Sequence, residues 1–276
     1  MSAVMWQSVS KGTGTLLALA TAASVLVAIA PEARASAAPD PAVVQALQRL
    51  GNGTWSNADV ELIASNPALA DKVPDPRVPA AVDAEEIEYE VFDDGTMQAI
   101  STTGLSQADE SKAWDAVRLP DLIKGPKGQD VSEADEVEVP EETDPVSAVA
   151  AGDARAANVE AAAGRWKTKR VSITHKSLLG TTLYKYHHRA RFKYNGSKVT
   201  AWGARSDYTS NENGFVQVGN RTRNEKTRLP AASAHSLMKR RIDLCMPVYG
   251  CYDTLYPWIK IKMKGSGATS HDSRTY

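Results

Sequence analysis

Basic side chains alternate with apolar or aromatic ones in two segments of this 276-residue chain, and that pattern could bind an anion. Between residues 183 and 194 the aromatic and small side chains fall on one face of a predicted strand and the cations on the other. Residues 258–264 show the same alternation of cations and apolar side chains. Such a row of cations, with an aromatic ring at one end, suits a repeating anion: a nucleic-acid backbone, wall teichoic acid or an acidic glycan. The candidate binding residues are Lys185, Arg189, Arg191, Lys193, Trp202, Trp258, Lys260 and Lys262.

Six further cations could extend this basic surface. They are Arg221, Arg223, Arg228, Lys239, Arg240 and Arg241. A second interpretation is that lysines on open strand faces and edges keep a sheet soluble and prevent it from pairing with other sheets. The sequence leaves both interpretations open.

Groups suited to acid–base catalysis are present, but the sequence does not bring them together. His187, His235, Glu212 and Glu225, with the many arginines, are residue types that a ribonuclease uses, because phosphoryl transfer needs a proton donor, an acceptor and cationic stabilisation. The chain has no G-x-S-x-G elbow, no H-E-x-x-H motif and no phosphate-binding glycine loop. We therefore expect a binding protein, and keep a secreted hydrolase or ribonuclease-like toxin with an acidic pro-region as the alternative.

We expect no metal and no cofactor. His187 and His188 are neighbours on a predicted strand, so their side chains point to opposite faces and cannot readily share one ion. The two cysteines, Cys245 and Cys251, lack a second Cys/His pair at zinc spacing.

Cys245 and Cys251 are instead predicted to form one disulfide. They are close in sequence and lie in a part of the chain that we expect to be exported, where thiols are normally oxidised. A loop closed by a disulfide is rigid and could present Met246 and Tyr249 to a protease. A protease inhibitor is therefore the third functional interpretation.

The dipeptide Asn195-Gly196 is typical of a two-residue type I′ hairpin turn. That turn would place Phe192 opposite Val199 and Arg189 opposite Trp202, where the guanidinium could lie over the indole and contribute about 0.5 to 1 kcal/mol. Further strands are expected near residues 171–175, 215–218, 236–244 and 258–264. Six or more short strands predict a mainly β chain with a C-terminal antiparallel β-sandwich or small barrel.

Short helices are expected before residue 80. Asp40 followed by Pro41 predicts the start of the first helix, because aspartate caps helices and proline is tolerated at the first helical position. Ser56 or Asn57 can cap a second helix, and Asn66 followed by Pro67 can open a third.

A β-hairpin and a linker follow the helices. Residues 86–92 alternate as a strand does, Asp94-Gly95 predicts a turn, and 97–101 can be the return strand. Two strands alone are marginal, so we expect this hairpin to pack on the preceding helices. Residues 129–144 are rich in Glu, Asp and Pro without a periodic apolar face, and we interpret them as disordered.

Charge divides the chain into two halves. Residues 37–164 include 26 acidic and 8 basic residues, a formal charge of −18, and residues 165–276 include 6 acidic and 22 basic residues, a formal charge of +16. A tethered acidic segment has a high effective concentration beside the basic half and could mask its surface.

The predicted organisation is a signal peptide (1–37), an acidic helical and β-hairpin region (38–128), an acidic, alanine-rich linker (129–164) and a basic β domain (165–276).

The N-terminus has the three parts of a cleavable signal peptide. Lys11 precedes an apolar run from Leu16 to Ala30, and small residues at A-x-A spacing follow. A transmembrane helix needs about 20 apolar residues, more than this run supplies, and no later segment is apolar enough to be one. We therefore expect a secreted, extracellular protein whose mature chain has no transmembrane segment.

Several short phrases resemble uncharacterised exported proteins of actinobacteria. They are Asn66-Pro67-Ala68-Leu69-Ala70, Val73-Pro74-Asp75-Pro76, Tyr194-Asn195-Gly196 and Tyr256-Pro257-Trp258-Ile259. The resemblance implies a bacterial extracellular setting and brings no activity or site residues. From the residues themselves we expect a secreted, non-enzymatic binding or surface-associated protein whose basic β domain engages an anionic polymer of the cell wall or extracellular medium.

Overall fold

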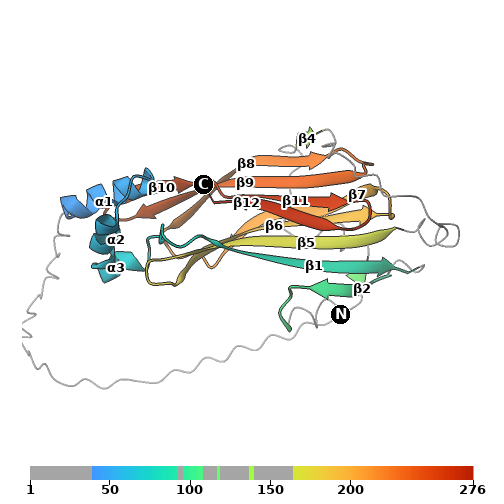
Figure 1. The fold of residues 1–276 in the computed structure, drawn as a ribbon, viewed down its shortest axis with the longest axis horizontal. Helices are drawn as coiled ribbons and strands as arrows, with labels where there is room; N and C mark the ends of the chain where they lie inside the picture. The colour runs from blue at the N-terminus through green and yellow to red at the C-terminus, as the bar shows by residue number, and fades with distance from the viewer. Residues whose placement is uncertain (1–38, 93–95, 108–116, 119–136, 140–163, 276) are drawn as a thin grey trace, which may run out of the picture. The chain divides into compact units, whose positions relative to one another are not determined.

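The computed structural model describes residues 39–92, 96–107, 117–118, 137–139 and 164–275. The predicted signal peptide lies outside these residues, as does the predicted linker except for 137–139 and Gly164. Within them, three short helices precede two β-sheets (Figure 1). In the described part of the chain, no helix is long and apolar enough to cross a membrane.

The three helices begin at the predicted caps. They are α1 (Pro41–Gly51), α2 (Asn57–Ala64) and α3 (Pro67–Ala70). The side chains of Asp40, Ser56 and Asn66 each accept a hydrogen bond from a backbone N–H in the first turn, which satisfies donors that have no partner inside the helix. Apolar side chains of the helices, with Leu47 and Ile63 among the most buried, form a small core that includes Met246 of the β region.

The strands form two separate sheets, and this confirms the mainly β prediction. The first sheet has the order β3 (Val117–Arg118), β2 (Thr96–Thr103), β1 (Ala81–Val91), β5 (Arg165–Lys176), β6 (Thr182–Tyr194) and β7 (Val199–Ser210). The second has the order β12 (Thr269–Arg274), β11 (Trp258–Lys264), β9 (Ser233–Met246), β8 (Val216–Thr227) and β4 (Val137–Val139), and β10 (Gly250–Leu255) also pairs with β9. The sheets do not form a closed barrel.

One apolar core is shared by the two sheets. Ile173 and Phe192 of the first sheet are fully buried in the same cluster as Ile242 and Ile259 of the second. The predicted alternation is confirmed in β6 and in β11, where apolar side chains enter this core and the residues between them do not.

The N-terminal hairpin is predicted to pack on the helices, but in the structure it joins the first sheet. β1 pairs with β2 on one side and with β5 on the other, in a register that runs from Ala81 opposite Thr174 to Tyr89 opposite Trp166. Strand pairing satisfies the backbone groups of both edges, and glutamates of β1 face lysines of β5.

A three-residue strand lies within the segment that we interpreted as disordered. Val137–Val139 pairs in parallel with the edge of β8, with Val137 opposite Glu225 and Val139 opposite Thr227. Valines are favoured in strands, and the short alternation Val-Glu-Val suits a sheet edge.

The turn between β6 and β7 differs from the predicted type I′ turn. Asn195 Oδ1 accepts hydrogen bonds from the N–H groups of Ser197 (3.2 Å) and Lys198 (2.9 Å), so the turn spans four residues. Gly196 has φ +90°, whereas a type I′ turn also needs positive φ at Asn195. Tyr194 therefore pairs with Val199, and the predicted register was wrong.

The predicted disulfide is present between Cys245 and Cys251, which are direct cross-strand neighbours in β9 and β10. Of the two side chains predicted to face a protease, one is buried and the other is partly buried. Met246 is buried against the helices, and Tyr249 packs at the edge of the same cluster.

Candidate functional site

The two predicted cationic stripes lie in different sheets. Phe192 of β6 and Ile261 of β11 are both in the shared core, so the cations between such residues point away from the core on opposite sides of the molecule. β6 carries Lys185, Arg189, Arg191 and Lys193, and β11 carries Trp258, Lys260 and Lys262. One polymer cannot follow both stripes without passing around an edge of the sheets.

Trp202 lies on the inner side of the first sheet, away from Arg189. Its Nε1–H donates a hydrogen bond to the carbonyl of Thr227 at 2.9 Å. A bulge in the pairing of β6 with β7 places Arg189 opposite Ser206. The cation that lies over the indole is Arg205, at 5.5 Å from the ring.

The outer face of the first sheet is already well packed around its arginines. Arg170 of β5 lies directly opposite Arg189, and its charge is balanced by an ion pair with Glu85. Arg191 donates to the hydroxyl of Thr168 at 3.1 Å. Both Arg189 and Arg191 take part in interactions within the protein, so these two predicted binding residues also have a structural role.

Two lysines of β5 point toward the second sheet, a direction that the sequence did not reveal. Lys169 donates to Glu86 at 2.9 Å and to the Thr269 hydroxyl at 2.8 Å. Lys167 lies 3.5 Å from Glu88. Acidic side chains of β1 thus neutralise part of the positive charge of the C-terminal half.

A buried ionic cluster between the sheets was also missed by the sequence reasoning. The Asp207 carboxylate, with no exposed side-chain surface, lies 2.7 Å from Arg221 and 2.8 Å from Arg240, and Tyr186 donates to it at 3.2 Å. Burial alone would raise the pKa of Asp207, but hydrogen bonds and charge from the two arginines hold it below its ordinary value. This cluster connects β7 to β8 and β9.

Three turns meet at the end of the sheets away from the helices, and we call this region the three-turn end (residues 195–198, 228–232 and 265–268). The N–H of Gly265 donates to the carbonyl of Ala232 at 2.8 Å, and Val199 and Ala231 exchange two backbone hydrogen bonds. A Cβ on Gly265 would lie 2.1 Å from the backbone of Ser197, so glycine allows the close approach.

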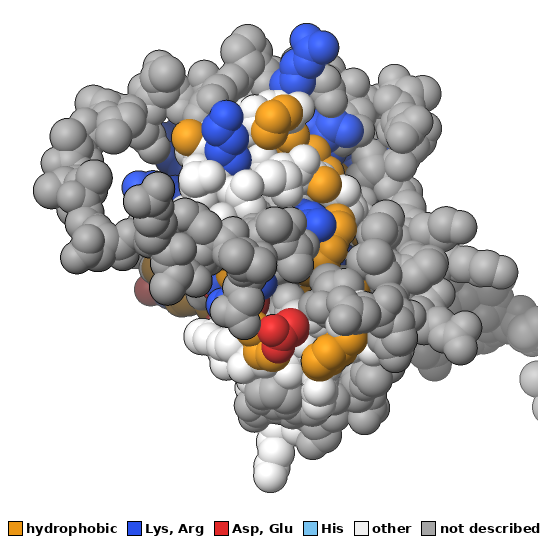
Figure 2. Space-filling view, turned by 90° about the vertical axis from the view of Figure 1, so that its right-hand side faces the viewer, with side chains coloured by type: hydrophobic (Ala, Val, Ile, Leu, Met, Phe, Trp, Pro, Cys, Tyr) orange, Lys and Arg blue, Asp and Glu red, His pale blue; other side chains and the backbone are white. Residues whose placement is uncertain are grey.

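The three-turn end and the strand ends directly beside it carry cations that have no acidic partner within the described residues. They are Lys193, Lys198, Arg228 and Lys264. All but Lys193 are exposed. Figure 2 looks at this end and shows Lys and Arg side chains at several places on the described surface, with fewer acidic ones. Three of these residues were not among the predicted binding residues, although Arg228 was a candidate extension.

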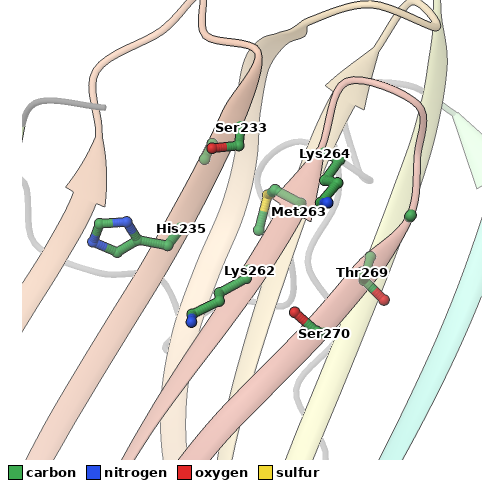
Figure 3. A pocket seen from close by; sticks show the side chains of 9 residues that line it. Ser233, His235, Lys262, Met263, Lys264, Thr269 and Ser270 are labelled. Carbon is green, nitrogen blue, oxygen red and sulfur yellow. The ribbon is translucent and has the colours of Figure 1, made fainter. Parts of the chain in front are cut away.

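A small pocket opens beside these cations on the second sheet (Figure 3). Its volume is about 250 Å³. Lys262 is opposite both His235 and Ser270 in the strand register, so these three side chains form a row across β9, β11 and β12. Lys262 also pairs with Asp272 at 3.0 Å. With Lys264 at its edge, the pocket offers ammonium and hydroxyl donors of the kind that hold a phosphate or carboxylate.

The histidines considered for acid–base catalysis lie on different sheets. His187 stacks on Tyr208 of the first sheet, with 4.4 Å between ring centroids. His235 of the second sheet contacts Thr227 at 3.1 Å. Burial and the neighbouring charges of Arg170 and Lys185 lower the pKa of His187 to about 4, so it is neutral near pH 7. The structure does not bring these two histidines together.

No family model, no curated protein and no solved structure matches this chain. Among the described residues, no group of three or more His, Cys, Asp and Glu side chains could hold a metal ion.

Proposed function

We propose that this chain is an exported, non-enzymatic binding or surface-associated protein whose three-turn end engages an anionic polymer. The observation that supports this most is the set of four cations, Lys193, Lys198, Arg228 and Lys264, on or directly beside three turns held together by backbone contacts. Like charges repel one another, so an anion bound among them would relieve that repulsion. The two stacked sheets, which we infer to be a β-sandwich, provide a rigid scaffold for the turns.

A repeating anion fits this surface better than a single small one. The pocket beside Lys264 can hold one phosphate or carboxylate group. Lys198 and Arg228 lie on the other two turns, and Lys193 lies on β6 beside the first of them, so a polymer that passes around this end of the sheets could contact them with its next groups. Repeated weak contacts of this kind give binding that depends strongly on salt concentration.

The proposal predicts binding to polyanions without their cleavage. The full mature chain should be titrated with single-stranded RNA, teichoic acid and an acidic polysaccharide at about 50 and 200 mM salt. We expect at least one polymer to bind, with an affinity that falls by about tenfold or more between the two concentrations. The lengths of the polymers should be measured after incubation. Shortening would favour the hydrolase or ribonuclease-like alternative, and binding that does not respond to salt would contradict the proposal.

We also propose that the acidic half reduces the affinity of the basic half for such polymers. The ion pairs of Glu85, Glu86 and Glu88 with β5, and the pairing of Val137–Val139 with β8, support this part of the proposal.

Masking predicts that fewer acidic charges give tighter polymer binding. Changing Glu133, Glu136, Glu141 and Glu142 to Gln in the full chain should strengthen RNA binding by about three- to tenfold at low salt, because repulsion of the polymer is reduced. A matched control is the same number of Glu and Asp changes in and around the three helices, at Asp40, Glu61, Asp71 and Asp75. Equal strengthening by both sets would show an effect of net charge only and would exclude masking by the acidic segment.

A further inference from the structure

A second, chemically different groove lies at the helical end of the molecule. Its volume is about 580 Å³. The end of α1, the loop between α1 and α2, residues 74–80 before β1, the end of β5 and the last part of β10 all contribute to its walls. Leu50, Trp55, Pro79 and Leu255 give it apolar surface. An engineered apolar cavity of about 150 Å³ holds a benzene molecule, so this groove has room for an aromatic ring with a substituent.

A buried polar atom without a protein partner belongs to His175, which lines this groove. The Nε2 atom of His175 is buried and has no hydrogen-bond partner among the described residues. The His175 ring stacks on the fully buried ring of Tyr184, whose hydroxyl also lacks a partner in the described structure. Buried polar atoms are normally hydrogen-bonded, so such atoms beside a groove point to a missing ligand or water.

The Asp253 carboxylate gives the groove an unbalanced negative charge. The other two charged groups of the lining, Asp75 and Arg77, neutralise each other through two hydrogen bonds of 2.8 Å. No cation within the described residues pairs with Asp253. Burial raises the pKa of Asp253 to about 6, in spite of a hydrogen bond from the backbone of Thr254. Burial also lowers the pKa of His175 to about 4, so the imidazole is neutral and can accept a hydrogen bond.

We propose that this groove binds an organic monocation, a protonated amine that carries an aromatic or branched apolar substituent. The ammonium group would donate hydrogen bonds to Asp253 and would balance the carboxylate charge. The apolar substituent would lie against Trp55, Leu50 and Leu255. An anion would be repelled by Asp253, and a neutral molecule would leave that charge without a partner.

Three probes of similar shape test the charge preference. Benzylamine, benzyl alcohol and benzoate should be titrated into the full chain, with chemical shifts of the indole N–H of Trp55 as the readout. We expect benzylamine to bind with a Kd on the order of 1 mM, as is usual for so small a ligand. Benzyl alcohol and benzoate should bind at least about tenfold more weakly. Equal affinity for the three probes, or no binding of benzylamine, would overturn the proposal.

Two variants separate a loss of charge from a loss of fold. Asp253→Asn keeps the size of the side chain and should weaken benzylamine binding about tenfold while leaving benzyl alcohol unchanged. Asp272→Asn, on β12 and outside the groove, makes the same change of net charge and should leave both probes unaffected. If benzylamine binds Asp253→Asn as tightly as the unaltered protein, Asp253 does not hold the amine and the proposal fails.

Discussion

Replacing Asp207 with Ala is expected to lower the free energy of unfolding by about 3 to 5 kcal/mol. The substitution leaves Arg221 and Arg240, whose side chains are only 14% and 17% exposed, without the carboxylate that neutralises them. Removing one partner of a buried ion pair is costly because the remaining charge has lost most of its contact with water. Tyr186, fully buried, also loses the acceptor of its hydroxyl.

The loss of stability should depend on how deeply the ion pair is buried. Asp272 and Lys262 also form an ion pair, at 3.0 Å, but their side chains are 51% and 41% exposed. Asp272→Ala should therefore cost less than about 1 kcal/mol, as exposed pairs do. Urea unfolding of both variants measures the difference, and Asp207→Asn provides a milder change if Asp207→Ala does not fold. Similar losses for the Asp207 and Asp272 variants would contradict the structure of the cluster.

The Asp207 carboxylate should also make the free energy of unfolding depend on pH. The pKa of Asp207 in the folded protein is below its ordinary value, so the unfolded chain binds a proton more readily than the folded one. This contribution to stability is present above the unfolded pKa and is lost as the pH falls through the folded pKa. The Asp207→Asn variant should therefore lose less stability on acidification than the unaltered protein does.

Changing Lys193, Lys198, Arg228 and Lys264 together to Gln should weaken polyanion binding by about 30- to 1,000-fold at low salt. The estimate assigns about 0.5 to 1 kcal/mol to each exposed charged contact. These side chains lack acidic partners among the described residues, so their replacement should leave the unfolding midpoint nearly unchanged. Fluorescence anisotropy with labelled single-stranded RNA measures the affinity.

A control with the same change of net charge distinguishes the site from a general attraction. Lys176, Lys185, Lys239 and Arg274 lie outside the three-turn end, and Lys185 belongs to the predicted stripe on β6. Changing these four residues to Gln should weaken binding less than about threefold. If both sets of substitutions have the same effect, the affinity comes from overall charge, and the three-turn end has no special role.

Local features of this fold could be predicted from the sequence because local rules determine them. The side chains of Asp40, Ser56 and Asn66 cap helices at the predicted positions. The alternation in β6 and β11 correctly separated core residues from the others, and the two cysteines pair as expected.

Features that depend on tertiary contacts could not be predicted in the same way. The hydrogen bonds of Asn195 lengthen the turn, and the bulges after it move Trp202 away from Arg189. Asp207 is charged and would ordinarily be placed at the surface, but two arginines from other strands make its burial possible. Lys193, Lys198, Arg228 and Lys264 come from distant parts of the sequence, and only the packing of the three turns places them at the same end of the sheets.

The salt dependence of RNA binding shows whether the cations of the three-turn end contact the polymer. For a single-stranded nucleic acid, the slope of log K against log salt is about −0.7 for each phosphate that a cation neutralises. If the three-turn end makes four such contacts, the slope of the unaltered protein should be steeper by about 3 than that of the variant in which Lys193, Lys198, Arg228 and Lys264 are Gln. Equal slopes for the two proteins would show that these residues do not contact the polymer and would contradict the proposed function.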